Sequence, residues 1–486
     1  MLLWSAPNGR LGPCCSGPYC GGMRIHIAAL GGTIASVPTD SGGVSPSVSG
    51  EDIARAARLD TIDVDAVAGH ATSPAGQVGE EGGQGAGASS SGLQLTFEQV
   101  AQVGSGSITV EHLVSVVESA RTAADEGAVG VVLTQGTDTL EETAFVLSRI
   151  NDSGIPIVVT GAMRNPSLPG ADGPANVRAA VIAALSPQVR GLASALVMAD
   201  EIHDPVFVRK DHTSFIHAFS SGPSAGPLGW VSEDRVILPH VPAGSCGGLA
   251  GAVGADGVAA AAGETRPVGV AAAAGGEARP AGVAGAAGAA PRPQFPGLTS
   301  DDVFPQVAVI AVGLGDSLAI LDGVAGAGYA GCVLAGVGGG HVPQSVLPAV
   351  ERLAQQMPVV YSSRTGSGSA LENTYGYPGA EIGLQKMGLV PSGVLDPYKA
   401  RLQLRLALAV GENGGAGGVG ADVRAGVEAA FAPFRPGFTQ QCNSPPTPDS
   451  RSNADLRVNV GAPPRPDSRA NADSRVNALQ QRVTLH

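Results

Sequence analysis

The sequence predicts an α/β protein with mainly parallel sheets, interrupted and flanked by low-complexity inserts and tails. Three observations support this prediction. Continuous apolar runs recur along the chain, helical stretches separate several of them, and the many Gly (71) and Pro (36) residues are concentrated in a few segments. Continuous apolar strands that alternate with helices are typical of parallel sheets covered on both faces. The 486 residues, 43% of them hydrophobic, suffice for a sizeable core.

The first half of the chain contains four predicted strands and three predicted helices. The strands are the apolar runs "IHIAAL", "GAVGVVLTQ", "IPIVVTGA" and "GLASALVMA". Helical stretches precede the second strand and follow the second and third strands. The strands are predicted at 25–30, 127–135, 155–162 and 191–199, and the helices at 108–126, 139–152 and 175–186.

A second, shorter series follows a long Ala/Gly/Pro-rich interval. Its strands are "QVAVIAVGL", "GCVLAGVG" and "MPVVYSS", and one helix precedes the last of them. This repeats the alternation of the first half and predicts a second parallel sheet. The strands are predicted at 306–314, 331–338 and 357–363, and the helix at 346–356.

Four segments lack the apolar content that would offset the entropy of ordering them. The tail contains the near-duplicates "PDSRSNADLRVN" and "PDSRANADSRVN", two copies being too few for a solenoid. We expect a disordered extension, a flexible insert, an interdomain linker and a disordered tail at 1–22, 68–92, 241–303 and 436–486, respectively.

Charge and cysteine usage exclude several classes of protein. The balance of 29 Lys+Arg against 42 Asp+Glu gives a net charge of −13, unsuited to general binding of nucleic acid. The six cysteines form neither a disulfide framework nor a zinc-ligand spacing, which favours a reducing compartment and a cytoplasmic location. No apolar run reaches the 18 residues of a membrane span. We expect a small-molecule substrate, with neither a nucleic acid nor a membrane as partner.

Polar residues follow the predicted strands at the edge where α/β proteins bind ligands. Gly31, Gly32 and Thr33 follow the first strand, and glycines there permit close approach of backbone. Thr137 and Asp138 follow the second strand. The next four residues fit a helix capping box, which assigns a structural role to Thr139 and Glu142. Asp172, in a Gly- and Pro-rich stretch, is interpreted as a turn or cap acid, and Lys210 follows the fourth strand.

These residues point to acyl transfer. Thr33, Thr137, Asp138 and Lys210 would supply two hydroxyls, a carboxylate and a lysine at one rim of a sheet. An alcohol is a poor nucleophile until a base and an oxyanion site support it. That set suits attack on an amide or ester, with water completing the reaction. The histidines show no metal-binding pair, so no metal site is expected.

The motifs "LGGTIAS", "TQGTDTLEETAF", "VVTGAMRNPS" and "VMADEIHDPVFVRKDHTS" resemble those of the bacterial-type L-asparaginase (asparaginase/glutaminase) family. The segment "SSRTGSGSALENTYGYPGAEIGLQKMGLVPSG" resembles its C-terminal domain. The resemblance covers about 23–60, 96–240 and 304–412. It implies a larger flavodoxin-like or Rossmann-like N-terminal catalytic domain (23–240) and a smaller C-terminal α/β domain (304–435). It also implies hydrolysis of asparagine to aspartate and ammonia without a cofactor.

The resemblance also implies roles for individual residues. Thr33 matches the nucleophile, while Thr137, Asp138 and Lys210 match a second triad that positions water and binds the substrate's amino group. Family members are usually tetramers built from dimers, so we expect a homodimer or homotetramer. The implied substrate-binding residues are Ser105, Asp138, Thr137, Gly32 and Gly136, and the residues implied to act across the subunit interface are Glu381 and His341.

This sequence departs from the family pattern near the first threonine. Many members carry a tyrosine on the following loop, and Val44 stands in its place here. Gly106 stands where a glutamine is frequent. We hypothesise that Tyr375 or Tyr377 substitutes for the missing tyrosine.

Three other functions remain open. The chain could be a glutaminase-asparaginase of broader specificity. It could be the amidase subunit of a tRNA-dependent amidotransferase, although 1–22 is too short for the extra N-terminal domain of that subunit. Without the loop tyrosine, it could also be a catalytically dead amino-acid-binding or scaffold homologue, against which the intact Thr33, Thr137, Asp138 and Lys210 argue.

Overall fold

The computed structural model describes two α/β lobes, one on each side of the predicted linker. The segments predicted to be disordered or flexible lie almost entirely outside the described residues, as do Gly32 and Thr33. The structure describes residues 23–31, 36–38, 44–46, 50–68, 92–239, 294–413 and 421–436.

In the described part of the chain, the N-terminal lobe is built on an eight-stranded sheet. Its strand order is β12-β11-β8-β7-β6-β5-β1-β4. The five strands from β7 to β4 are parallel. The central strands β5, β6 and β7 are apolar and buried almost throughout, whereas the edge strand β4 is mostly polar and exposed. These strands are β1 (Arg24–Ala29), β4 (Gln94–Gln99), β5 (Ala128–Thr134), β6 (Ile157–Thr160) and β7 (Ser194–Met198).

The order of the parallel strands is that of a flavodoxin-like sheet. The first strand along the chain, β1, lies between the second, β4, and the third, β5. Successive connections therefore run in opposite directions from β1, which places the topological switch point between β1 and β5. Ligands of open α/β sheets bind beyond the carboxyl ends of the strands at such a point. This confirms the predicted fold class and selects the residues that follow β1 and β5.

An antiparallel extension completes the sheet. Two-residue turns join β7 to β8 and β11 to β12, with positive φ at Ala199, Asp200, Glu233 and Asp234, as type I′ hairpins require. Strands β9 and β10 form a separate two-stranded antiparallel sheet. The elements are β8 (Glu201–His203), β9 (Arg209–Lys210), β10 (Phe219–Ser220), α6 (Gly222–Ala225), β11 (Gly229–Ser232) and β12 (Arg235–Ile237).

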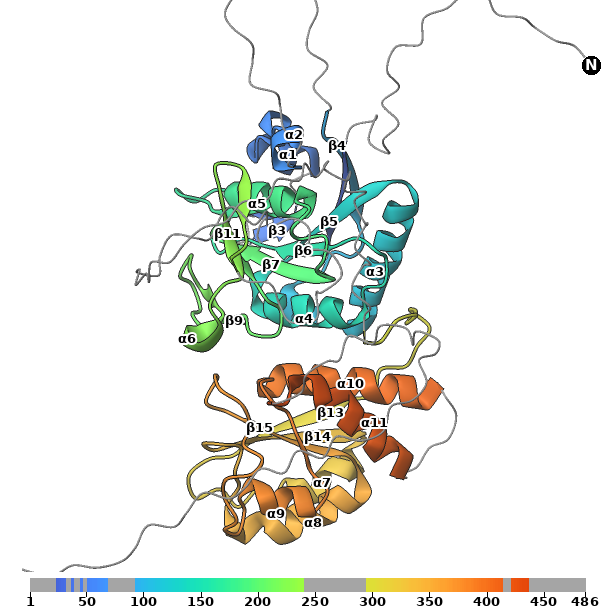
Figure 1. Cartoon of the computed structure of the whole chain (residues 1–486), viewed down its shortest axis with the longest axis vertical. Helices are drawn as coiled ribbons and strands as arrows, with labels where there is room; N and C mark the ends of the chain where they lie inside the picture. Colours follow the sequence, from blue (N-terminus) through green and yellow to red (C-terminus); the bar gives the residue numbers. More distant parts are fainter. Residues whose placement is uncertain are drawn as a thin grey trace, which may run out of the picture. The chain divides into compact units, whose positions relative to one another are not determined.

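Helices cover both faces of the parallel strands (Figure 1). The buried residues of α3 and α4 belong to one hydrophobic cluster, whereas those of α1, α2 and α5 belong to another. The helices are α1 (Gly50–Ala56), α2 (Val64–Val67), α3 (Val110–Asp125), α4 (Leu140–Ile150) and α5 (Gly173–Leu185), the 3-10 turns are η2 (Leu59–Thr61), η3 (Ser105–Ser107) and η4 (Thr137–Thr139), and β2 (Ser36–Pro38) pairs with β3 (Val44–Pro46).

The C-terminal lobe contains a four-stranded, fully parallel sheet in the order β13-β14-β15-β16. Buried residues of α7, α8 and α9 pack on one face, and those of α10 and α11 pack on the other. The elements are β13 (Val307–Ala311), α7 (Leu321–Val324), η5 (Ala325–Ala327), β14 (Gly331–Gly336), η6 (Gln344–Val346), α8 (Leu347–Gln356), β15 (Val359–Ser363), α9 (Glu381–Lys386), β16 (Val390–Pro391), α10 (Pro397–Asn413), α11 (Ala421–Phe431) and η7 (Ala432–Phe434).

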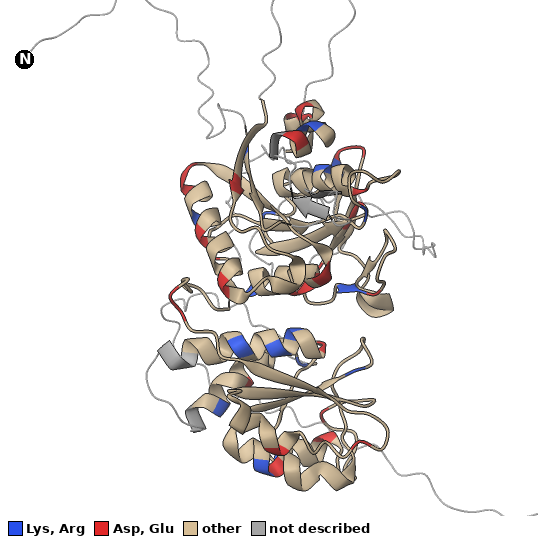
Figure 2. Ribbon diagram, turned by 180° about the vertical axis from the view of Figure 1, so that it is seen from behind, with Lys and Arg blue, Asp and Glu red and all other residues tan. Residues whose placement is uncertain are grey.

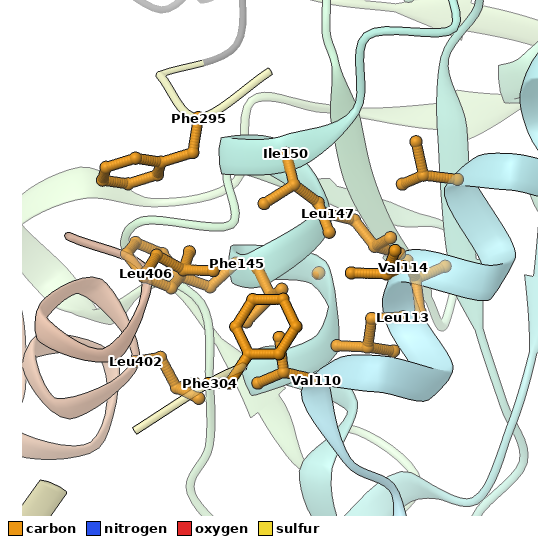
Figure 3. Packing of buried hydrophobic residues seen from close by; sticks show 14 of the residues in the cluster. Val110, Leu113, Val114, Phe145, Leu147, Ile150, Phe295, Phe304, Leu402 and Leu406 are labelled. Atoms are coloured by element: carbon orange, nitrogen blue, oxygen red, sulfur yellow. The ribbon is translucent and has the colours of Figure 1, made fainter. Parts of the chain in front are cut away.

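One apolar cluster joins the two lobes. Figure 3 shows Phe145 of α4 among side chains of α3, such as Val110 and Leu113, and of α10, such as Leu402. All four side chains are buried. Helix α10 therefore packs against both the N-terminal helices and its own sheet.

Candidate active site

Thr137 lies directly beyond the carboxyl end of β5, in the 3-10 turn η4 that leads into α4. The residue before it, Gly136, lies where there is no room for a side chain. A Cβ atom there would lie 2.9 Å from Ser105 Cβ and 3.0 Å from Ser105 Oγ. The glycine therefore lets the β5 end and the Ser105 turn approach each other closely.

Ser105 and Asp138 contact each other across this close approach. Ser105 Oγ donates to Asp138 Oδ2 at 2.9 Å, and Thr139 Oγ1 donates to the Ser105 carbonyl at 2.9 Å. The expected capping box is wrong, because Thr139 makes no side-chain cap bond at α4 and Glu142 pairs with Arg401. The threonine hydroxyl instead fastens the Ser105 turn to the start of α4.

Lys210 joins this group from strand β9. Its Nζ donates to Thr137 Oγ1 at 2.9 Å and to Asp138 Oδ1 at 2.8 Å. The lysine side chain is only 11% exposed, whereas that of Asp138 is 73% exposed. The carboxylate is thus held by two neighbours and still open to a ligand from outside.

A second lysine supports the segment that precedes Lys210. Lys399, buried on α10, donates from Nζ to the carbonyl oxygens of Val206 and Val208. Lys399 was not predicted from the sequence, although a signal was present. The chain has only three lysines among its 29 cationic residues, namely Lys210, Lys386 and Lys399. Two of those three therefore lie at or just behind this cluster.

The surroundings of the cluster shift the pKa values of its carboxyl groups in opposite directions. Hydrogen bonds from Lys210 and then Ser105 lower the pKa of Asp138 below its ordinary value. Burial, by contrast, raises the pKa of Glu141 from 4.5 to about 7. Figure 2 marks acidic residues at the start of α4 and basic residues along α10, where Arg401 Nη2 lies 3.4 Å from Glu142 Oε2.

This arrangement can support chemistry at a carbonyl group. The Lys210 ammonium, donating to Thr137 Oγ1, stabilises negative charge that develops on that oxygen. Asp138, whose pKa is lowered below its ordinary value, is anionic at neutral pH and can pair with a ligand's ammonium group. The structure therefore brings together the predicted residues Thr137, Asp138, Lys210 and Ser105.

The first predicted threonine cannot be placed in the same way. Thr33 and Gly32 lie outside the described residues, which stop at Gly31 on this side. Gly31 has φ +100°, and a Cβ on it would lie 2.8 Å from the Val103 carbonyl oxygen. The backbone thus leaves β1 at the switch point through a conformation that favours glycine, as the sequence indicated.

Glu381 and His341 form a separate cluster on the C-terminal lobe. His341 Nε2 lies 2.9 Å from Glu381 Oε2, and the Tyr377 hydroxyl lies 2.7 Å from His341 Nδ1. The ring of Tyr375 packs edge-on against His341 at 5.5 Å. Among the described residues, no hydrogen bond or ion pair links this cluster to Thr137, Asp138 or Lys210.

The described residues contain neither a metal-binding cluster nor a membrane-spanning helix. No group of three or more His, Cys, Asp or Glu side chains in the described segments could hold a metal ion. None of the helices in those segments is long and apolar enough to cross a membrane.

Family models match both lobes. Residues 24–243 match the model described as "Asparaginase, N-terminal", and residues 306–416 match "Glutaminase/Asparaginase C-terminal domain". Together the two matches cover most of the chain and span every element of both main sheets.

Curated relatives carry corresponding names. A "Probable L-asparaginase" of Deinococcus radiodurans is 31% identical over 66% of this chain and 83% of its own length. An "L-asparaginase" of Bacillus licheniformis is 25% identical over 79% of this chain and 95% of its own length. A "Probable L-asparaginase periplasmic" of Haemophilus influenzae is 28% identical over 64% of this chain and 74% of its own length.

Proposed function

The chain belongs to the asparaginase family, and we propose that it hydrolyses the side-chain amide of L-asparagine to give L-aspartate and ammonia. The observation that carries this proposal is the contact of Lys210 with both Thr137 and Asp138 at the carboxyl end of β5. It places a hydroxyl, a cation and an anion within one hydrogen-bonded group. An amide substrate with a free ammonium group needs such a set.

Each residue has a role in this proposal. Thr33 is the nucleophile that forms the acyl-enzyme, as expected from the family. Thr137, supported by Lys210, positions the water that releases the product. Asp138 binds the substrate's α-ammonium and Ser105 its α-carboxylate. The backbone at Gly32 and Gly136 lines the substrate site, because glycine lets the ligand approach the main chain. No cofactor takes part.

The proposed assembly is a homodimer or homotetramer in the cytoplasm. In it, Glu381 and His341 of one copy complete the site of another. The location rests on the cysteine usage, which favours a reducing compartment. One of the relatives above is named as periplasmic, so fractionation of cells that express the chain is the direct test of location.

The proposed function is tested by measuring initial rates of ammonia release from L-asparagine and L-glutamine. We expect asparagine to be the better substrate, and the Thr33→Ala and Thr137→Ala variants to lose nearly all activity. Thr122→Ala, on the exposed face of α3, is the control for loss of a threonine and should behave as the unchanged chain does. Equal rates on the two amides would favour a glutaminase-asparaginase. Unchanged ammonia release from both active-site variants, or aspartate binding without any turnover, would reject the proposal.

A further inference from the structure

The main chain that leads into Lys210 is held by a buried cation of the C-terminal lobe. Lys399, the third residue of α10, donates from Nζ to the Val206 carbonyl at 3.0 Å and also to the Val208 carbonyl. Val208 directly precedes β9, the strand to which Lys210 belongs. The two contacts therefore hold the segment from which the catalytic lysine projects.

Lys399 directs its close contacts to that segment. The side chain is only 1% exposed, and the carboxylate of Asp396, its ion-pair partner, lies farther away, with Oδ2 at 3.7 Å from Nζ. Burial of an ammonium group is unfavourable unless its donors are satisfied, and here burial lowers the pKa of Lys399. The two main-chain carbonyls are the groups that satisfy them.

Strand β9 has little other support. It has two residues and pairs with β10 in a sheet of its own, separate from the eight-stranded sheet whose strand β5 leads to Thr137. An isolated two-stranded pair is only marginally stable. In the segment before it, the amides of Val206 and Val208 bond locally to Asp204. Within the described part of the chain, the hydrogen bonds that reach 205–208 from another element are the two from Lys399.

The position of this segment matters because of the geometry at Lys210. Its Nζ lies 2.9 Å from Thr137 Oγ1 and 2.8 Å from Asp138 Oδ1. A lysine carries its charge at the end of a flexible four-carbon stem, so the main chain must place the start of that stem. Misplacement of a catalytic group by roughly 1 Å can cost about 10²-fold in rate.

We propose that Lys399 is a positioning residue for amide hydrolysis, which places Lys210 against Thr137 by holding the main chain at Val206 and Val208. This inference rests on the proposed function and gives the C-terminal lobe a role in the site of its own chain. Lys399 contacts none of the grouped residues directly. Its loss should therefore lower kcat and leave substrate binding through Asp138 nearly unchanged.

Arg405 provides a matched control on the same helix. It is also buried, and it donates to the carbonyls of Phe304 and Pro305, which lead into β13 rather than β9. We expect Lys399→Met to lower kcat on asparagine by about 10- to 100-fold and to change KM by less than about threefold. Arg405→Met removes the same kind of contact and should keep near-normal kcat. Both variants are compared at a temperature where circular dichroism shows them to be folded.

A milder replacement covers the case in which Lys399→Met does not fold. Lys399→Gln keeps a polar side chain but is too short to reach both carbonyls, so it should lose kcat to a smaller extent. A normal kcat in either Lys399 variant, or a loss of kcat equal to that of Arg405→Met, would overturn this inference and leave the proposed function standing. Absence of hydrolysis by the unchanged chain would overturn both.

Lysine labelling tests the position of Lys210 without any hydrolysis. Acetic anhydride forms an amide with a free amine and releases acetate, and the chain has only three lysines, Lys210, Lys386 and Lys399, which peptide masses distinguish. Lys210 is 11% exposed and held by two acceptors, so it should react more slowly than the exposed Lys386. Lys399→Met should raise the labelling of Lys210 relative to Lys386 several-fold, and Arg405→Met should leave that ratio unchanged. The same ratio in Lys399→Met as in the unchanged chain would show that Lys210 keeps its place without Lys399, contrary to the inference.

Discussion

Lys210 Nζ lies 2.9 Å from Thr137 Oγ1, although the two residues are 73 positions apart in the sequence and belong to different elements. Thr137 follows a central parallel strand, whereas Lys210 belongs to the short antiparallel pair β9–β10. The contact therefore exists only because that pair folds back over the carboxyl end of β5. The position of this two-residue strand decides whether the site is complete.

Replacement of Lys210 should abolish catalysis without unfolding the chain. We expect Lys210→Met to lower kcat by about 10²- to 10⁴-fold, because it removes the cation that stabilises charge on Thr137. Lys210→Arg should not restore activity, since a planar guanidinium cannot donate to both partners from the same point. Steady-state rates and circular dichroism of both variants are the measurements. Lys386→Met, at an exposed position, is the control, and a Lys210→Met variant with more than a tenth of normal kcat would contradict the assignment.

Replacement of Lys399 should act on stability. This buried ammonium, whose pKa is lowered by burial, donates to the Val206 and Val208 carbonyls. Lys399→Met leaves both carbonyls without that donor, so we expect the free energy of unfolding to fall by about 2–5 kcal/mol. Urea unfolding measures this loss. Lys386→Met should change the free energy of unfolding by less than about 0.5 kcal/mol, and equal effects of the two replacements would contradict the role of Lys399.

The longer buried strands could be predicted from the sequence because tertiary context reinforces their local pattern. The apolar run 127–135 becomes β5, Ala128–Thr134, which is buried along almost its whole length. Strand β9 has only two residues, Arg209–Lys210, and no apolar pattern. It is a strand because β10 pairs with it, and the sequence carries no local signal of that pairing.

Helix α10 was missed for a different reason. Leucines recur at every second position over 402–408, which resembles the alternation of a strand. The segment is a helix buried on two sides. Leu404 and Leu408 pack toward Gly331 of β14, while Leu402 and Leu406 lie near Phe145 of α4 (Figure 3). Because the helix lies between two lobes, even polar residues such as Lys399 and Gln403 are buried, which obscures the amphipathic pattern.

The part of the site that directly follows strands could be predicted, because the end of a strand determines where the next residues lie. Thr137 and Asp138 were found because they follow β5, and Asp172 is confirmed as a turn acid that accepts from the Met163 and Arg164 amides. Lys399 could not be placed in this way, because its partners lie more than 190 residues away. Which of the two tyrosines hydrogen-bonds to His341 also depends on side-chain geometry that the sequence does not encode locally.

Gly136 should be intolerant of even one added carbon. A Cβ at this position would lie 2.9 Å from Ser105 Cβ, so Gly136→Ala must displace the Ser105 turn and with it the contact to Asp138. We expect kcat/KM on asparagine to fall by about 10- to 100-fold, since misplacement of a binding group by roughly 1 Å costs that much. Gly104→Ala is the control, because a Cβ there meets nothing within 4 Å. Equal kcat/KM values for the two variants would show that the close approach is unimportant.

Glu141 should make the chain less stable as the pH rises. Burial raises its pKa from 4.5 to about 7, and among the described residues its Oε2 is buried without a hydrogen-bond partner. Between about pH 4.5 and 7 the unfolded chain loses this proton while the folded chain keeps it. The contribution of Glu141 to the free energy of unfolding therefore falls through that window and is constant above it.

Glu141→Gln removes this dependence, because the amide is neutral at every pH. We expect the variant to gain about 1–3 kcal/mol over the unchanged chain above pH 7, and the gain to shrink toward zero as the pH falls to 4.5. Urea unfolding at pH 5.5, 6.5 and 8 measures the difference. Glu428→Gln, at an exposed position of α11, controls for the loss of one carboxyl group. A gain that stays the same at all three pH values would mean that Glu141 is already ionised in the folded chain at pH 5.5, contrary to its burial.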